Sequence, residues 1–356
     1  MDDSWLIYGA TGYSGRLIAE EAVKRGYRPL LGGRSIEKLR PLAEQFGLEY
    51  AAFDLSAAES VLHERGIKLV LHAAGPFAHT SRPMLDACLA VKAHYLDITG
   101  EISVFQNTFA HDQAARDARV ALISGVGYDI VPSDCLIRYV ADKVEAPESL
   151  EVVIVGPGGA GGDLGVSAGT LKTNLEMIAD GFVMRRNGAL VPVDVGSGVK
   201  SFRFPDGEHT GLIIPWGDVV TAYRPAGIPN ITAYLTFPTN QLMMLRYGGF
   251  LLRRLLQIDS LRGWASRQIE QRIVGPDEHA RQTGRSNMYA QVTGKDGQKA
   301  EAWLETIEAY QLTILASVNA VERVFSDHPV GALSPSQAFG ADFVMQIPQT
   351  VRQDHL

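Results

Sequence analysis

The sequence predicts an α/β fold: a Rossmann-type, doubly wound parallel sheet, followed by a second α+β domain that is mostly antiparallel. Two observations predict the first sheet. Apolar strand-like runs alternate with helical patterns over residues 1–130, and a glycine triplet follows the first apolar run. Near Leu150 this alternation gives way to short alternating strands. We therefore expect a first domain at 1–130, a second at 131–325, and a tail at 326–356 that packs back on the first.

The first turn carries the most informative motif. The apolar run Trp5–Tyr8 ends in Gly9, Gly12 and Gly15, and a helical pattern follows at once. In a dinucleotide-binding turn the first glycine permits a tight turn, the second lets the pyrophosphate approach, and the third packs the helix on the strand. The N-terminus of that helix then faces the phosphates. The cofactor contacts predicted from this turn are Gly9, Thr11, Gly12, Tyr13, Ser14 and Gly15.

The end of the second strand indicates which dinucleotide is bound. A strand is expected at 28–33, and an NAD-selective site usually places Asp or Glu at its end to hold the ribose 2′-hydroxyl. This chain has Arg34 there, with Ser35 beside it and Lys38 one helical turn later. The planar donors of an arginine suit a 2′-phosphate. The cofactor predicted is therefore NADP.

The rest of the first domain continues the alternation. Further strands are expected at 49–53, 68–74, 94–97 and 120–124, and helices at 37–46, 57–66, 83–93 and 104–119. Ligands of such sheets bind beyond the carboxyl ends of the strands. We therefore add Asp54, which could bond the adenine amino group, and the turn Gly75, Pro76 and Phe77 to the cofactor site.

The second domain shows a different pattern. Strands are expected at 151–156, 189–193, 199–204, 211–214, 230–237, 286–294 and 299–307, and helices at 169–179 and 310–325. The last two strands flank the hairpin signal Lys295-Asp-Gly297. A glycine-rich stretch at 156–165 follows the strand expected at 151–156.

Three side chains are candidate proton donors. Tyr128 and Asp129 follow the sixth strand of the first domain, and Asp218 lies beside Trp216 in a turn-rich part of the second. Partial burial there would raise the pKa of the Asp218 carboxyl group. Each of the three could instead make only a structural hydrogen bond. We expect Trp216 to form an aromatic substrate wall.

The segment 241–275 opens with an apolar run, 241–256, into which three arginines are interleaved. It could bury its apolar face in the core or in a dimer interface. It could instead make a peripheral contact with a membrane or a lipid-like substrate. Gly248 and Gly249 would weaken or kink a helix here.

Composition excludes several classes of protein. The net charge of −7 and the absence of a basic stripe argue against a nucleic-acid partner. No signal peptide, bilayer-spanning run or metal-ligand spacing is evident, and Cys88 and Cys135 fit buried packing positions in a reducing compartment. We expect a cytoplasmic homo-oligomer without a metal.

Several segments together resemble the saccharopine dehydrogenase-like oxidoreductases, and most of all their bacterial branch named trans-acting enoyl reductases. The matching segments are 9–15, 33–35, 74–77, 94–101, 127–134, 215–218 and 227–230. The resemblance implies a two-domain NADP-dependent enzyme. We expect it to reduce a C=C or C=N bond of a small or lipid-like substrate, with Arg224 as the nearest candidate for a substrate carboxylate. The alternative is a non-catalytic NADP-binding protein that acts at a partner or lipid surface.

Overall fold

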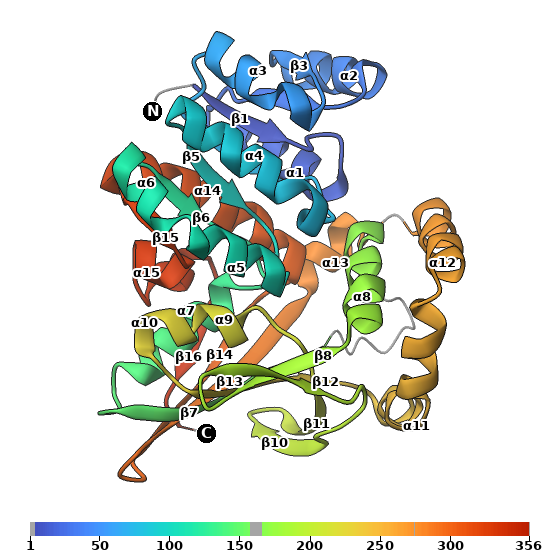
Figure 1. Ribbon diagram of the computed structural model, residues 1–356, viewed down its shortest axis with the longest axis vertical. Helices are drawn as coiled ribbons and strands as arrows, with labels where there is room; N and C mark the ends of the chain where they lie inside the picture. Colours follow the sequence, from blue (N-terminus) through green and yellow to red (C-terminus); the bar gives the residue numbers. More distant parts are fainter. Residues whose placement is uncertain (1–3, 157–165, 274, 356) are drawn as a thin grey trace. The chain divides into compact units, whose positions relative to one another are not determined.

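The computed structural model describes residues 4–156, 166–273 and 275–355, and the chain divides into two compact units (Figure 1). The first unit comprises Met1–Val131 and Tyr310–Phe343, and the second comprises Pro132–Ala309 and Val344–Leu356. The predicted stretch at 156–165 lies outside the described residues apart from Gly156.

The first unit contains a seven-stranded sheet in the order β15-β6-β5-β4-β1-β2-β3. Every pairing in it is parallel. Its strands are β1 (Trp5–Tyr8), β2 (Leu30–Gly33), β3 (Tyr50–Ala52), β4 (Leu69–His72), β5 (His94–Asp97), β6 (Ala121–Ile123) and β15 (Gly331–Leu333). The central strands β1 and β4 are buried over their whole length, as expected when helices cover both faces of a parallel sheet.

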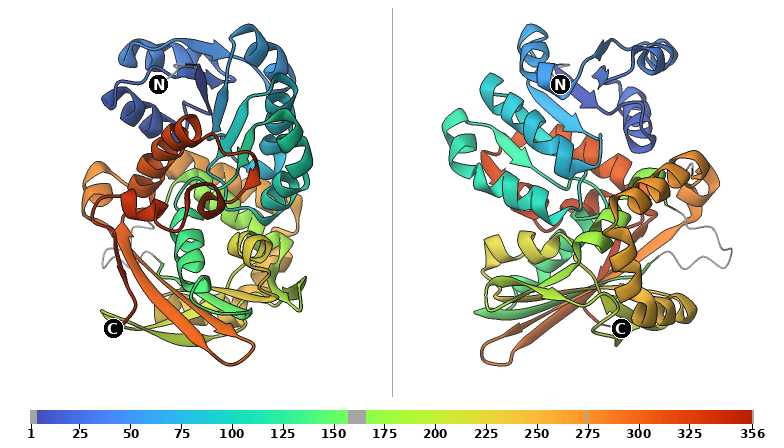
Figure 2. Two further views of the ribbon diagram at one scale, coloured as in Figure 1. Left: turned by 90° about the vertical axis from the view of Figure 1, so that its left-hand side faces the viewer. Right: turned by 45° about the vertical axis from the view of Figure 1, so that its right-hand side comes forward.

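Helices lie on both faces of this sheet (Figures 1 and 2). They are α1 (Tyr13–Lys24), α2 (Ile36–Phe46), α3 (Ala58–Glu64), α4 (Phe77–Val91), α5 (Ile102–Ala110), α6 (Asp112–Ala118), α14 (Ala309–Asp327) and α15 (Pro335–Phe339), with a short 3₁₀ turn at Leu55–Ala57. A second 3₁₀ turn, Phe343–Gln346, begins at the last residue of this unit and continues into the second. Buried side chains of α3, α4 and α6 share one apolar cluster with the sheet. The predicted α/β class is confirmed.

The second unit is built on a nine-stranded mixed sheet. Its main order is β10-β11-β12-β7-β13-β14-β16, and only the pairing of β12 with β7 is parallel. The strands are β7 (Pro147–Ile154), β8 (Phe182–Arg186), β9 (Ala189–Val193), β10 (Lys200–Phe204), β11 (Gly207–Ile213), β12 (Asn230–Thr236), β13 (Arg285–Gly294), β14 (Lys299–Ile307) and β16 (Val351–Gln353). The predicted hairpin is the pair β13–β14.

The helices of the second unit include five that the sequence analysis did not predict, namely α7, α9, α10, α12 and α13. They are α7 (Val131–Ala141), α8 (Ala168–Asp180), α9 (Asp218–Thr221), α10 (Tyr223–Ala226), α11 (Thr239–Leu256), α12 (Asp259–Arg272) and α13 (Glu278–Thr283). Gly248 and Gly249 do not interrupt α11. Within the described residues, no helix is both long and apolar enough to cross a bilayer.

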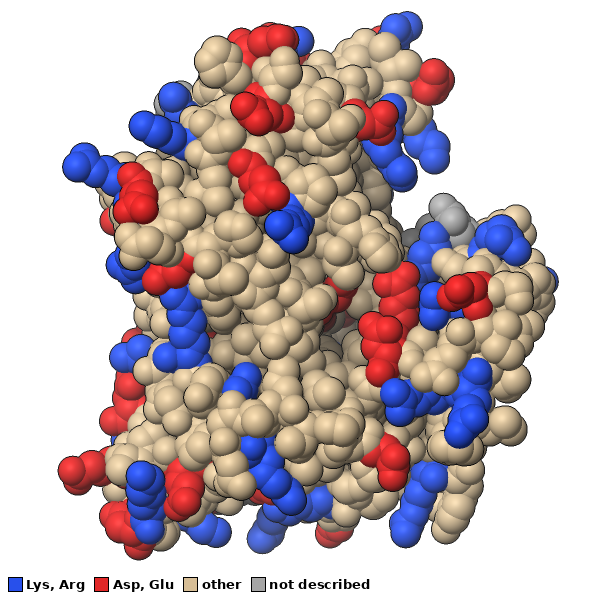
Figure 3. Space-filling view, viewed as in Figure 1, with Lys and Arg blue, Asp and Glu red and all other residues tan. Residues whose placement is uncertain are grey.

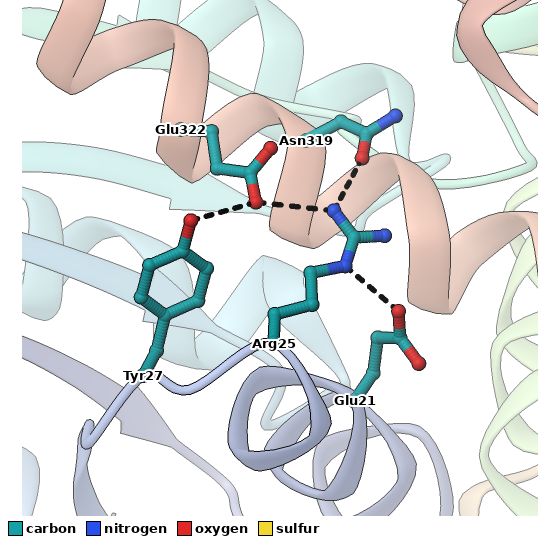
Figure 4. Close-up of polar contacts among 5 residues, drawn as sticks. All are labelled: Glu21, Arg25, Tyr27, Asn319 and Glu322. Carbon is teal, nitrogen blue, oxygen red and sulfur yellow. Dashed lines mark hydrogen bonds and ion pairs between the residues drawn. The ribbon is translucent and has the colours of Figure 1, made fainter. Parts of the chain in front are cut away.

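The chain divides differently from the expected boundaries in two places. Residues 310–325, expected in the second domain, cluster with the first unit. Polar contacts explain this, because Arg25, at the end of α1, bonds Asn319 at 2.7 Å and Glu322 at 3.2 Å, and Tyr27 also bonds Glu322 (Figure 4). The tail divides as well: β15 pairs with β6, whereas β16 pairs with β14 in the second unit.

Candidate active site

The glycine turn after β1 is shaped by close backbone contacts. Gly9 has a φ of +90°, and a Cβ atom there would lie 2.7 Å from the Ala74 amide nitrogen. A Cβ on Gly15 would lie 2.9 Å from the Gly9 carbonyl carbon and closer still to its oxygen. Both positions therefore require glycine for the fold.

Gly12 differs from the other two glycines. Its φ of −75° suits any residue, and a Cβ there would meet only the Gly9 oxygen, at 3.2 Å. Gly12 is exposed and is the N-cap of α1, where it offers no side chain of its own to cap the helix. The fold alone does not require glycine here. A glycine at such a position is expected where a phosphate must approach the backbone closely.

The remaining predicted contacts of the glycine turn are exposed or partly buried. Thr11 is exposed, and Tyr13 and Ser14 are partly buried. The Tyr13 ring packs edge-on against Tyr310, with 5.1 Å between centroids. One end of α14 therefore supports the start of α1 within the first unit.

The end of β2 places polar groups where the sequence predicted them. Arg34 is exposed, and Ser35 caps α2 by accepting a hydrogen bond from the Lys38 amide. Burial raises the pKa of Tyr8, while the nearby charge of Arg34 lowers it and that of Asp54 raises it. Arg34 and Asp54 therefore lie near the same tyrosine at the carboxyl edge of the sheet.

A cation that the sequence reasoning missed lies in the same region. Arg16, directly after the third glycine, lines a surface hollow together with Thr11 and Lys38. The other residues of this hollow are Pro41, Leu42 and Gln45. Its position next to the glycine motif is the signal that could have identified Arg16.

The turn after β4 is held by a carboxylate. Phe77 and Ala78, at the start of α4, donate backbone hydrogen bonds to the two Glu101 oxygens at 2.9 and 2.6 Å. Gly75 is exposed and Pro76 is partly buried. The sequence reasoning did not assign Glu101 a role, although it follows β5 at the same edge as the other site residues.

Asp129 lies close to this carboxylate. A Cβ on Gly100 would lie 2.9 Å from an Asp129 carboxylate oxygen, so the glycine makes room for the acid. Burial, with a smaller contribution from the negative charge of Glu101, raises the pKa of Asp129 to about 6. Neighbouring Tyr128 is partly buried, and Thr313 accepts a hydrogen bond from its backbone amide at 3.0 Å.

The three other candidates lie in the second unit. Asp218, in the first turn of α9, is fully buried, and its carboxylate accepts a hydrogen bond from Thr221. Burial raises its pKa well above the usual range, in the direction predicted, and the charge of Asp134 adds to the shift. The indole nitrogen of Trp216 is buried with no hydrogen-bond partner among the described atoms. Arg224 is partly buried in α10.

Comparison with known proteins identifies the first segment. Residues 5–123 match the family model described as the saccharopine dehydrogenase NADP binding domain. This segment is therefore similar to the NADP-binding domain of saccharopine dehydrogenases. The predicted resemblance is confirmed, and the matched family and the curated relatives are oxidoreductases.

Curated relatives of this NADP-binding domain share it over part of their length. A trans-acting enoyl reductase from Mycobacterium bovis (strain BCG) is 34% identical over 139 residues, which are 36% of this chain and 33% of that protein. One from Mycobacterium ulcerans is 30% identical over 144 residues, 38% of this chain and 34% of that protein. The chain thus spans about a third of the length of these curated relatives.

A solved structure extends the similarity of fold to both units. Apo saccharopine dehydrogenase (L-Glu forming) from Saccharomyces cerevisiae superposes with a TM-score of 0.63, covers 96% of each chain and is 11% identical. At this identity the similarity concerns the fold alone.

Proposed function

We propose that this protein is an NADPH-dependent reductase of a polarised C=C bond in a small or lipid-like substrate. The observation that carries the proposal is the glycine turn after β1. The fold requires glycine at Gly9 and Gly15 but not at Gly12, which lies between them. The family of residues 5–123 supports NADP as the cofactor. The names of the curated relatives favour a C=C bond, and a C=N bond is the second choice.

Each cofactor group has a candidate partner in the first unit. The turn around Gly12 would hold the pyrophosphate, and Arg34, Ser35 and Lys38 would hold the 2′-phosphate, with Arg16 as a further cation. Asp54 would accept a hydrogen bond from the adenine amino group. The turn at 75–77 would face the nicotinamide, because it lies at the end of the central strand β4.

The bound cofactor would supply a hydride to one carbon of the double bond. The protein must then supply a proton to the other carbon. Asp129 suits this role better than a tyrosine of ordinary pKa, because its pKa of about 6 lies closer to neutral pH, where a general acid is most effective. Glu101 would keep that pKa raised and would fix the turn that ends at Phe77.

Asp218 remains the alternative donor. Burial raises its pKa, which favours the protonated acid that a donor needs, but the same burial and its hydrogen bond from Thr221 also fit a structural role. In this proposal Trp216 provides an apolar wall for the substrate, and Arg224 a contact for its polar end.

Turnover separates this proposal from the alternative of a non-catalytic NADP-binding protein. The full chain is mixed with NADPH and a panel of short and long enoyl thioesters and of imine-forming amine and carbonyl pairs, and loss of nicotinamide absorbance is followed. We expect oxidation with an enoyl acceptor, and loss of it in Asp129→Asn but not in the surface control Asp142→Asn. Tight NADPH binding without turnover on any acceptor would instead favour the non-catalytic protein.

A further inference from the structure

The consecutive helices α11 and α12 carry an unusual concentration of exposed apolar side chains. Nine of the fourteen large apolar residues that are exposed in the described chain lie between positions 243 and 264. Tyr247 is 73% exposed, Phe250 65% and Trp264 58%. The nine are Met243, Met244, Tyr247, Phe250, Leu251, Leu255, Ile258, Leu261 and Trp264. A contiguous apolar surface of this kind marks an interaction site.

The exposed side chains form a second apolar face on α11. The inner face is buried through Leu242, Gly249 and Leu256, which recur at intervals of seven residues. Gly249 lets the helix approach Val195, whose oxygen would lie 2.9 Å from a Cβ there. The spacing of Met244, Tyr247 and Leu251, all exposed, places them on the opposite side of the helix. The helix α11 therefore packs on its own unit through one apolar face and exposes a second apolar face.

Polar contacts also anchor the inner side. Arg253 donates a hydrogen bond to the Asp180 carbonyl oxygen at 3.1 Å, and Gln257 donates one to the Ala179 oxygen at 3.4 Å. Both acceptors lie at the end of α8. The outward face is thus presented by a helix fixed at its base.

Positive charge accompanies the apolar face. Residues 239–273 contain six arginines and two acidic residues, a local charge of +4 in a chain of net charge −7. The Arg254 guanidinium lies 4.9 Å from the centre of the Phe250 ring, and that of Arg246 lies 5.7 Å from the Tyr247 ring. In Figure 3, blue side chains, fewer red ones and uncharged surface lie over α11 and α12, on the right of the view. Aromatic and arginine side chains interleaved on one helix face suit the headgroup level of a membrane.

We propose that the outward face of α11 and α12 binds the surface of an anionic lipid bilayer, with both helices lying in the plane of the interface. The apolar side chains insert at the boundary between headgroups and acyl chains, and the arginines pair with lipid phosphates. The charge surplus favours this occupant over an uncharged apolar surface. This inference does not depend on the proposed catalytic activity.

The test is flotation of the full chain with vesicles of phosphatidylcholine alone or with a third of phosphatidylglycerol. We expect binding to the anionic vesicles, weaker binding to the neutral ones, and weakening by salt. Phe250→Ser with Trp264→Ser should lower the affinity roughly tenfold or more. Arg246→Gln and Arg254→Gln should each lower it about fivefold, from about 1 kcal/mol per arginine.

A matched control and a second readout keep the test specific. Val351→Ser removes an apolar side chain that is 48% exposed on β16 and should leave binding unchanged. Trp264 is the most exposed of the four tryptophans, since Trp5 and Trp303 are buried and Trp216 is partly buried. Membrane insertion should therefore shift the fluorescence to shorter wavelength, and Trp264→Phe should abolish most of this shift. Circular dichroism checks that every variant is folded.

Three results would overturn the inference. One is no flotation with either kind of vesicle. Another is flotation that Phe250→Ser with Trp264→Ser leaves unchanged. The third is a concentration-dependent dimer that those two substitutions dissociate, without any lipid binding, because a second copy of the chain would then cover this face.

Discussion

Replacing Gly12 by valine should abolish NADPH binding without unfolding the protein. Gly12 has φ −75° and ψ 166°, an extended conformation that valine adopts readily. A Cβ there would meet only the Gly9 oxygen, at 3.2 Å, which a shift of a few tenths of an ångström relieves. The new side chain would, however, occupy the space that the pyrophosphate needs at the start of α1.

The size of the expected loss follows from the contacts removed. If the side chain costs two charge-assisted hydrogen bonds between backbone amides and phosphate, the loss is about 3–6 kcal/mol, or roughly 10²- to 10⁴-fold in affinity. Gly15→Ala should behave differently, because its Cβ would lie 2.9 Å from the Gly9 carbonyl carbon. We expect that variant to lose on the order of 1–3 kcal/mol of stability as well as binding.

Fluorescence titration with NADPH and urea unfolding followed by circular dichroism measure the two quantities. Gly248→Ala is the control, because a Cβ atom at this position would have nothing within 4 Å and alanine favours a helix. It should bind NADPH normally and unfold at the same or a higher urea concentration. Normal NADPH affinity in Gly12→Val would refute the placement of the phosphates, and unfolding of Gly12→Val would refute the interpretation of its backbone.

The remaining predictions concern single side chains. Arg34→Ala should weaken NADPH binding roughly 10- to 150-fold and barely change NADH binding. The surface control Arg65→Ala should change neither affinity. An equal loss for both cofactors in titrations would show that Arg34 does not bind the 2′-phosphate. If Asp129 is the donor, kcat should fall as pH rises through about 6, because the protonated acid is required, and Asp129→Asn should remove this dependence; a profile that survives the substitution assigns the proton elsewhere. If Asp218 is the donor instead, Asp218→Asn should lower kcat by roughly 10²–10⁴ with NADPH binding intact, whereas lowered stability at unchanged kcat identifies a structural residue. Burial lowers the pKa of His94 from 6.5 to about 4, so the free energy of unfolding should fall by about 3 kcal/mol as the pH drops across that interval. In urea titrations at several pH values, His94→Asn should reduce this dependence of the unfolding free energy on pH, and an unchanged dependence would contradict the prediction.

The sequence predicted six of the seven strands of the first sheet because most of them are short, buried and parallel; β15, in the tail, was not predicted. Such strands appear as continuous apolar runs, and the turns between them carry glycines whose backbone geometry is distinctive. Gly9 illustrates this, because its positive φ and its close approach to Ala74 both demand glycine. A local pattern of this kind is visible in the sequence without knowledge of the fold.

The parts that the sequence could not predict depend on long-range contacts. The helix α14 belongs with the first unit because Arg25 reaches Glu322, 297 residues away in the chain. Nothing local to either residue signals this pairing. The role of Glu101 is similar, because its carboxylate accepts hydrogen bonds from Phe77 and Ala78, which precede it by more than twenty residues.

The segment 241–275 shows a different limit. Its apolar residues predicted a buried face in the core or an interface, or a lipid contact, and the sequence left these open. The described structure excludes the core for most of them, because Leu242, Gly249 and Leu256 are the buried residues of α11 whereas Met244, Tyr247 and Phe250 are exposed. Period alone cannot distinguish these cases, since a helix with two apolar faces has a weak amphipathic signal.

The first unit is proposed to bind NADP through a site that recognises the 2′-phosphate. Titration of the unmodified chain with NADPH and with NADH, in the same buffer at constant salt, tests it most directly. We expect saturable binding of both, at least about tenfold tighter for NADPH, because the proposed contacts of Arg34 and Lys38 are with the 2′-phosphate, which NADH lacks. Equal affinities, tighter binding of NADH, or no binding of either would contradict it.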